Sequence, residues 1–296
     1  MMMSPLSHPT IKKKTVLNPE EFIEVTELEK LCVEHEPVTL KLELDYKRGH
    51  LRTESEQNNE FLYYDEDLLI GYIGICQFGG EALEINGMVH PEYRRQGVFS
   101  ELFSYVKEEW ERRESLEMLL LNDSKSPAGQ AFIQTQGAEY EHSEHDMYLT
   151  TVPGDMNTTG KLTLRKATNE DAKEIAAQNA IYFQMDETRL TLPEEEEKHG
   201  VEIYMAEREE RSVGKVHLEI SEDKGGIYGL GVLPEERRKG YGRAIIMDAV
   251  NKLREKQVNK IMLQVVVDNK NALLLYQSCG FTIASTMDYY KLRKRK

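Results

Sequence analysis

One nine-residue stretch occurs twice in this chain and organises the rest of the sequence. Residues 232–240 read VLPEERRKG and residues 89–97 read VHPEYRRQG, with six of nine positions identical. The two copies lie 143 residues apart, whereas the repeats of a solenoid are only ~20–50 residues long. The sequence therefore predicts two duplicated domains, and the length of 296 residues is about twice that of an average domain.

The elements around the two copies follow the same order. In each half an apolar strand precedes the copy, and a helical pattern, a second strand, a short helix ending at a glycine and a last strand follow it. The strands are expected at 83–89, 118–121 and 147–150 in the first half and at 226–232, 261–267 and 287–292 in the second, with the glycines at 137 and 280.

The domain boundaries come from composition. Residues 152–160 are rich in turn formers and poor in apolar residues, so they are interpreted as a linker between a domain at 1–151 and a domain at 161–296. A new strand is expected at 161–166, and residues 169–171 supply a helix start.

The charge is −14 overall and is unevenly distributed. Residues 1–160 hold 14 basic and 30 acidic residues, and residues 161–296 hold 24 and 22. This balance excludes a chain that coats nucleic acid non-specifically. It also makes the second half less repulsive to a small polyanionic ligand.

Other features exclude several further classes of protein. No apolar run approaches the ~18 residues of a membrane helix, and the first residues lack the layout of a signal peptide, so a cytoplasmic protein with no membrane partner is expected. Cys32, Cys76 and Cys279 are too widely spaced for a disulfide framework or a zinc site. His142 and His145 have no third ligand nearby, so no metal is expected.

The second copy continues as a loop that suits a diphosphate. Residues 237–243 read RRKGYGR, and a helix begins within them. The first N–H groups of a helix have no internal partner and carry the positive end of the helix dipole. Gly240 and Gly242 allow a ligand to approach the backbone closely, and four basic side chains surround the turn.

A second motif follows at 268–281, which reads DNKNALLLYQSCGF. The loop matches the pattern [Gln/Arg]-x-x-Gly-x-[Gly/Ala], and Asn269 to Phe281 match Asn-x-x-Ala-x-x-Leu-Tyr-x-x-x-Gly-Phe. Together the two motifs resemble the GNAT superfamily of acetyl-CoA-dependent N-acetyltransferases. The resemblance covers 161–296 well and about 55–150 less closely.

The resemblance implies an α/β fold in which each tandem domain is a twisted mixed sheet flanked by helices, with acetyl-CoA in a cleft between two splayed strands. It implies that Tyr276 protonates the departing thiolate in a direct attack of the amine on the thioester. The residues that it assigns to acetyl-CoA are Leu230, Gly231, Val232, Arg237, Arg238, Lys239, Gly240, Tyr241, Gly242, Arg243 and Asn269.

The first half departs from this pattern. Phe99 stands where a small residue belongs, Ile133 aligns with Tyr276, and Ser126 aligns with Asn269. A domain without catalysis, in a structural, substrate-shaping or cofactor-binding role, is therefore expected. The residues of a possible second cofactor site are Val89, Arg94, Arg95, Gln96, Gly97 and Val98.

The predicted function is acetyl transfer to a primary amine in the second domain. A protein N-terminus is possible as the acceptor, but a small amine is favoured because Gln264 replaces a glutamate that N-terminal acetyltransferases of the family often carry. The alternative is a non-catalytic acetyl-CoA-binding sensor or partner-binding module. The identity of the amine and the oligomeric state stay open.

Some residues keep two interpretations. His217 and Glu219 are either one polar face of a strand or a route for the amine proton through water. Asp186, Glu187 and residues 194–197 form either a solvated acidic face or an attraction for a cationic amine. Cys279 is expected to be a small packed residue rather than a nucleophile.

Overall fold

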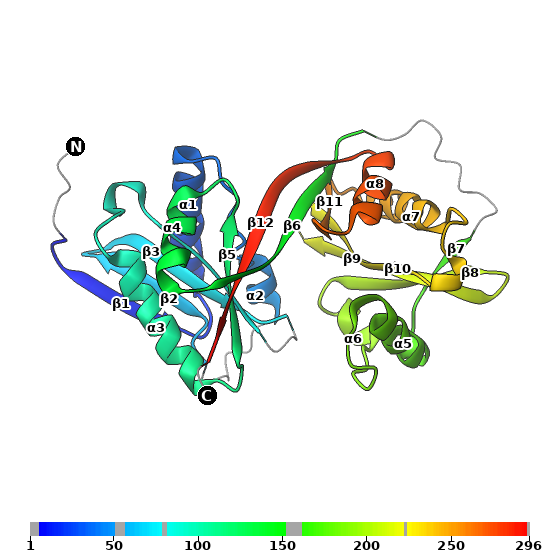
Figure 1. The fold of residues 1–296 in the computed structure, drawn as a ribbon, viewed down its shortest axis with the longest axis horizontal. Helices are drawn as coiled ribbons and strands as arrows, with labels where there is room; N and C mark the ends of the chain where they lie inside the picture. The colour runs from blue at the N-terminus through cyan, green and yellow to red at the C-terminus, as the bar shows by residue number, and fades with distance from the viewer. Residues whose placement is uncertain (1–5, 51–56, 79–81, 152–161, 222–223, 295–296) are drawn as a thin grey trace. The chain divides into compact units, whose positions relative to one another are not determined.

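The computed structural model of the chain describes residues 6–50, 57–78, 82–151, 162–221 and 224–294. The chain forms two compact units (Figure 1). Unit 1 contains Met1–Ser143 and Ser285–Lys296, and unit 2 contains Glu144–Ala284. The predicted linker at 152–160 lies outside the described residues.

Unit 1 is built on a mixed sheet. Its strands, in spatial order, are β1 (Pro9–Lys14), β2 (Glu60–Asp65), β3 (Leu68–Cys76), β4 (Leu83–Val89), β5 (Glu117–Asp123) and β12 (Phe281–Arg293). Only β4 and β5 are parallel, and they pair from Leu83 to Ile85 and no further. Because β4 continues to Val89, the two strands separate beyond Ile85 and leave a cleft, as the resemblance implied.

Helices cover both faces of the unit 1 sheet. Alternate residues of β2 divide between two cores: Leu62 and Tyr64 pack with α1 (Pro19–His35), and Phe61 and Tyr63 pack with α3 (Val98–Arg112). This alternation follows from the two-residue period of a strand. The remaining helices of the unit are α2 (Leu44–His50) and α4 (Pro127–Gln136).

Unit 2 repeats the plan. Its strands, in spatial order, are β6 (Glu139–Leu149), β11 (Lys260–Val266), β10 (Lys224–Val232), β9 (Arg211–Ser221), β8 (Val201–Arg208) and β7 (Thr163–Lys166). Its helices are α5 (Ala172–Phe183), α6 (Pro193–Glu197), α7 (Tyr241–Glu255) and α8 (Lys270–Ser278). Parallel pairing of β10 with β11 ends at Ile227, so these strands also separate.

The contiguous boundaries expected from the sequence differ from the observed units. The last strand, β12, was expected in the second domain, but from Met287 to Arg293 it pairs with β5 of unit 1. The later part of β6 was expected in the first domain, but Glu144 to Tyr148 pair with β11 of unit 2. The domains therefore exchange strands. A fragment of residues 161–296 would lack the strand beside β11 and would leave most of β12 without its partner.

Candidate functional site

The cleft of unit 2 opens at an irregularity in β10. The register against β9 shifts between Tyr228 and Gly231, and Gly229 has a φ of +54°, a conformation that favours glycine. Leu230, Gly231 and Val232 follow this bulge, beyond the last residue of β10 that pairs with β11. Their backbone therefore borders the cleft, in the place expected for the pantetheine arm of acetyl-CoA.

The loop after β10 leads directly into the start of α7. Arg238 and Gly240 have φ values of +65° and +86°, and Gly240 is the N-cap of α7. The amide of Ala244 bonds to the carbonyl of Gly240 at 3.2 Å, which is the first bond of the helix. The preceding amides at the helix start have no partner within the helix, which is the arrangement that binds phosphate.

Three of the basic side chains in this loop support it. Arg237 Nε donates to the carbonyl of Val232 at 3.0 Å, Lys239 pairs with a glutamate one turn earlier at 2.9 Å, and Arg243 donates to the carbonyl of Ser278 at 2.7 Å. Their positive charge still lies around the turn, but each side chain is hydrogen-bonded or ion-paired to another part of the protein and so acts as a brace for the loop. Because these side chains bind groups of the protein itself, the backbone amides are the candidate groups for a diphosphate.

The middle of the loop packs tightly. Tyr241 is buried, and its hydroxyl accepts a hydrogen bond from Arg208. A Cβ added at Gly242 would lie 3.0 Å from Leu275 of α8, so a glycine allows α7 and α8 to approach each other here.

The two motif residues of the second segment lie on α8. Asn269 is the N-cap of this helix, and its Oδ1 accepts from the amide of Ala272 at 3.2 Å. Tyr276 lies further along the helix and is 9% exposed. Burial, with a smaller contribution from Cys279, raises the pKa of the Tyr276 phenol to about 12. The phenol therefore keeps its proton at neutral pH.

Unit 1 has the same loop conformation. Arg95 and Gly97 have φ values of +66° and +87°, and the amide of Glu101 bonds to Gly97 at 2.9 Å to open α3. Arg94 Nε donates to the carbonyl of Val89 at 3.2 Å, as Arg237 does to Val232 in unit 2. The half whose motifs differ therefore has the same turn conformation at this loop.

A cavity of about 770 Å³ lies in the cleft of unit 1. Its walls include the predicted second-site residues Val89, Arg94, Arg95, Gly97 and Val98, while Gln96 is outside the wall. Its volume is typical of a small-molecule site.

The three altered positions of unit 1 contribute to this cavity. Phe99 packs edge-on against Phe132 of α4 at a centroid distance of 4.7 Å, and Ile133 is buried in the wall. Ser126 is the N-cap of α4 and accepts from the amide of Gly129 at 3.3 Å. Ser126 therefore caps its helix as Asn269 caps α8, whereas Ile133 brings no proton to the cleft.

Two basic side chains that sequence reasoning did not connect meet beside the β10 bulge. Lys215 of β9 is fully buried, and its Nζ lies 3.1 Å from His217 Nε2 and 3.0 Å from the carbonyl of Gly229. Burial lowers the pKa of the Lys215 amine to about 7. Burial and then Lys215 lower the pKa of His217 well below its usual value. The available signal was a lysine among apolar residues of a strand, on the same face as His217.

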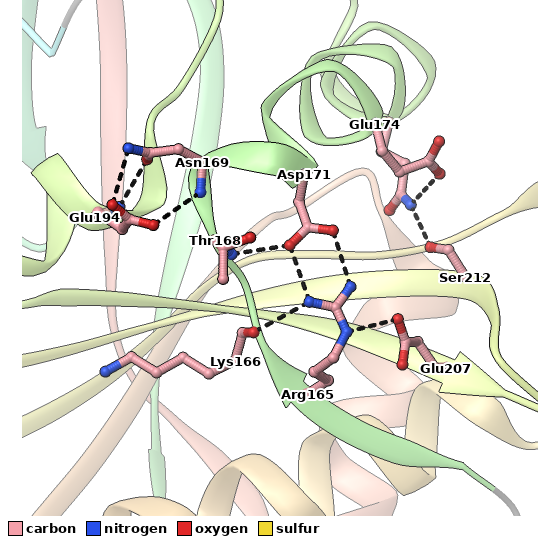
Figure 2. Close-up of polar contacts among 10 residues, drawn as sticks. Arg165, Lys166, Thr168, Asn169, Asp171, Glu174, Glu194, Glu207 and Ser212 are labelled. Carbon is pink, nitrogen blue, oxygen red and sulfur yellow. Dashed lines mark hydrogen bonds and ion pairs between the residues drawn. The ribbon is translucent and has the colours of Figure 1, made fainter.

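Helix α5 covers this pair. Gln178 donates to Ser212 of β9 and to Glu174, both at 2.8 Å, and accepts from the hydroxyl of Tyr182 at 3.0 Å (Figure 2 shows Glu174 and Ser212). The Tyr182 ring lies where a Cβ of Gly231 would be. The end of α5 is therefore fixed against the part of β10 that borders the cleft.

Most of the acidic run at 194–197 makes structural contacts. Glu194 bonds to the backbone and side-chain amides of Asn169 at 3.3 and 3.1 Å (Figure 2). Glu195 pairs with Lys198, and Glu197 pairs with Lys166. Asp186 accepts from the amide and hydroxyl of Thr188 and is exposed. These contacts favour a structural role for Glu194, Glu195 and Glu197.

The remaining candidates have structural surroundings. His142 stacks on Tyr289 at 4.4 Å, and Cys279 is fully buried, with burial raising the pKa of its thiol. Over the described ranges, no three His, Cys, Asp or Glu side chains come together as metal ligands. Within those same ranges, no helix has the length and apolar character needed to cross a membrane.

Comparisons with known proteins agree on the family for both halves. The profile of the acetyltransferase (GNAT) family matches residues 169–281, and that of the acetyltransferase (GNAT) domain matches residues 57–137. A mycothiol acetyltransferase of Thermobispora bispora is 40% identical over 87 residues, which are 27% of this chain and 30% of that protein. The chain thus matches less than a third of the length of the first curated relatives. An N-alpha-acetyltransferase 30 of Xenopus laevis is 23% identical over 67% of this chain and 78% of that protein.

Solved structures share the whole tandem fold. A GCN5-related N-acetyltransferase from Sphaerobacter thermophilus is similar with a TM-score of 0.77 at 16% identity, covering 97% of this chain and 96% of that one. A tandem GNAT protein from the clavulanic acid biosynthesis pathway has a TM-score of 0.70 at 13% identity, with 97% and 98% covered.

Proposed function

Since this chain belongs to the GNAT acetyltransferase family, with one GNAT domain in each half, we propose that it transfers an acetyl group from acetyl-CoA to a primary amine in unit 2. The observation that carries this proposal is the combination, in one unit, of the phosphate-binding turn at Gly240 and the buried, protonated Tyr276. Unit 1 has the turn but lacks the acid.

The residues of unit 2 suit acetyl-CoA, which when bound supplies the acetyl thioester and a thiol leaving group. The amides from Arg238 to Arg243 would hold the diphosphate, because they lie at a helix start whose φ values open the turn. The backbone of 230–232 would hold the arm as an added strand, since it lies beyond the pairing of β10 with β11. Asn269 would orient the arm only while it also caps α8.

Tyr276 would act as the general acid. Its pKa of about 12 keeps the phenol protonated throughout the physiological pH range. Transfer of this proton to the departing sulfur is worth roughly 10²–10⁴-fold, as is usual for general acid catalysis. A protein that only binds acetyl-CoA has no use for a proton donor at this position.

The proposed acceptor is a small amine. The relatives named mycothiol acetyltransferase favour this choice, although each matches only part of the chain. Gln264, which replaces the glutamate of N-terminal acetyltransferases, donates to Asp146 at 2.8 Å and thereby joins β11 to β6. Gln264 therefore has a structural contact and no capacity to act as a base.

Unit 1 supports a second candidate function, which is non-catalytic binding of a CoA thioester. Its cavity of about 770 Å³ is bordered by a loop with the same φ values as that of unit 2. Ile133 gives this cavity no proton donor. We expect this binding to be weaker than that of unit 2, because Phe99 occupies the position of Gly242 in the turn.

The test is a panel of amines incubated with acetyl-CoA and the full chain, with free thiol as the readout. We expect at least one small primary amine to be acetylated and free N-terminal peptides to be poorer acceptors. Calorimetry on the same protein should give about one tight acetyl-CoA site per chain. Tight binding with no thiol release from any amine or peptide would favour the sensor or partner-binding module instead.

A further inference from the structure

We propose that His217 and Lys215 form the proton acceptor for the amine in unit 2, with His217 taking the proton and Lys215 storing it. The proposal rests on the acetyl transfer proposed above and assigns the base that sequence reasoning left open. It would make His217 the catalytic residue and Lys215 the group that acts through it.

The geometry locks this pair to the β10 bulge. Lys215 Nζ contacts His217 Nε2 at 3.1 Å and the carbonyl of Gly229 at 3.0 Å. A Cβ at Gly229 would lie 3.0 Å from the ring of His217, and the φ of +54° also requires glycine. The strand that would hold the acetyl-CoA arm is therefore in direct contact with both basic side chains.

The surroundings of Lys215 are apolar. Its strand neighbours are Met205 on β8 and Gly231 on β10, and the rings of Tyr182 and Phe183 on α5 have their centroids 6.0 and 5.4 Å from Nζ. Such a site disfavours a cation that has no counter-ion. Burial alone lowers the pKa of the Lys215 amine to about 7, so a large fraction of this amine is unprotonated at neutral pH.

Few titratable groups face the pair. Tyr182 comes from α5, with Glu174 behind it through Gln178, and Tyr228 lies opposite His217 on β10. Glu219 is two residues beyond His217 on the same face of β9. None of the ion pairs of the described residues includes Lys215, so its charge is not neutralised by a carboxylate contact.

Unit 1 contains the matching site with a counter-ion. The residues 143 positions earlier are Tyr72 for Lys215 and Glu60 for Ile203. There the amine comes from Lys47, which bonds to Glu60 at 2.7 Å and to the Tyr72 hydroxyl at 2.6 Å. The same place in the fold thus holds a paired lysine in unit 1 and an unpaired one in unit 2.

The proton balance requires both residues of the pair. In the proposed step His217 carries its proton on Nε2 and donates to the lone pair of unprotonated Lys215 Nζ, while a hydrogen of Nζ bonds to the Gly229 carbonyl. A substrate ammonium gives a proton to Nδ1 as the Nε2 proton passes to Lys215. The freed amine forms the C–N bond and the C–S bond breaks, with the electron pair on sulfur.

Tyr276 then protonates the sulfur, and the second proton lost by the amine nitrogen replaces the tyrosine proton. The proton on Lys215 returns to Nε2 of the partly exposed His217, as the Nδ1 proton leaves to solvent. The net products are an amide, a thiol and one proton, so no other reactant is needed.

The direct test is an NMR titration of the full chain labelled with ¹³C at lysine Cε. The Lys215 signal is assigned by its loss in Lys215→Met. We expect a midpoint near 7, compared with about 10.4 for an ordinary lysine. A midpoint above about 9 would overturn the proposal, whatever the enzyme acetylates.

A matched pair of variants reproduces the counter-ion of unit 1. Ile203→Glu places a carboxylate opposite His217, as Glu60 is placed in unit 1, and should raise the Lys215 midpoint by at least about two pH units. Ile203→Gln has the same size without the charge and should leave the midpoint near that of the parent. Equal midpoints in the two folded variants would contradict the electrostatic account.

The kinetic test uses an amine that the panel has identified. Activity should rise as pH increases through about 7, because only the proton-free pair is a base. Lys215→Met should lower kcat/KM about 10²-fold at pH 7.5 and abolish the rise in activity around pH 7. Tyr72→Phe, at the equivalent position of unit 1, should keep the parent kcat/KM and the same rise with pH. Circular dichroism checks that each variant is folded.

The outcomes separate the two proposals. If no amine is acetylated but the Lys215 midpoint is near 7, the proposed function fails and the neutral lysine stands without a catalytic role. If an amine is acetylated and the activity of Lys215→Met still rises with pH around 7, the pair is not the base, and the proposal of acetyl transfer stands.

Discussion

The two units share the conformation of the turn at Gly97 and Gly240 and differ in the side chains around it. Both loops have a positive φ at an arginine and at the following glycine, and both brace β4 or β10 through an arginine that bonds to a valine carbonyl. At the position proposed for the proton donor, unit 2 has Tyr276 and unit 1 has Ile133. The comparison teaches that the conformation of the turn does not depend on the side chain at the position of Tyr276 or Ile133.

The buried lysines give a second difference. Lys47 of unit 1 is 3% exposed and is paired with Glu60, whereas Lys215 of unit 2 is fully buried with no carboxylate contact. A paired lysine can stabilise its surroundings, and an unpaired one destabilises them while it is charged. The second arrangement is explained by function more readily than by stability.

The largest expected effect is on acetyl-CoA binding in unit 2. Gly240→Asp adds a Cβ at a φ of +86° and an anion where a diphosphate would lie, so the tight site should weaken by about 10³-fold. Calorimetry measures this loss. Arg254→Gln, at the other end of α7, makes the same change in net charge and should bind normally. Retained tight binding in Gly240→Asp would place that site elsewhere.

Replacing each buried lysine by an uncharged residue should change the free energy of unfolding in opposite directions. Lys47→Met leaves Glu60 buried without its partner and should lower stability by about 3–5 kcal/mol. Lys215→Met removes a cation that has no counter-ion and should leave stability equal or higher at pH 7. Urea unfolding of both variants provides the comparison. If Lys47→Met kept the parent stability and Lys215→Met lost several kcal/mol, the two roles that we assign would be contradicted.

The pH dependence of this effect has a definite sign. The pKa of Lys215 is about 7 in the folded chain and about 10.4 when unfolded. The destabilisation is therefore complete below pH 7, and it diminishes by about 1.4 kcal/mol per pH unit as pH rises toward 10. The stability difference between the parent and Lys215→Met should shrink over this range. A difference that is constant from pH 7 to pH 10 would contradict a neutral folded lysine.

The smallest expected effect concerns the acceptor. Asp186→Asn with Glu187→Gln should raise KM for a cationic amine about threefold at low salt and less at high salt, because exposed charges are screened. The asparagine keeps an oxygen for the Thr188 contacts. Glu209→Gln with Glu210→Gln changes the same charge at a turn between β8 and β9 and should have no effect. Equal KM values for the two double variants would show that Asp186 and Glu187 do not attract the amine, which leaves the interpretation as a solvated acidic face.

Sequence reasoning reached the local features because each depends on neighbouring residues. The repeat around Gly97 and Gly240 and the helix starts follow from short patterns. The role of Tyr276 as an acid stays a prediction. The strand exchange did not follow from such patterns, since the residues of β6 and β12 do not by themselves specify which distant strand each one pairs with. Pairing between distant strands is decided by the packing of the whole chain.

The same limit applies to the candidate site. The role of Arg237 as a brace depends on the distance to Val232, and the environment of Lys215 depends on α5, about 35 residues earlier in the chain. The sequence shows that the side chains at these positions are basic. It does not show whether an arginine binds phosphate or a backbone carbonyl, or whether a lysine is charged or neutral.

The most direct test of catalysis in unit 2 is the kinetics of Tyr276→Phe, which removes only the hydroxyl. We predict that kcat falls by about 10²-fold while acetyl-CoA affinity stays within a few-fold, because the proton is needed mainly in the transition state. Tyr105→Phe, on α3 of unit 1, is the matched control and should be fully active. A fully active Tyr276→Phe would contradict catalysis through this acid.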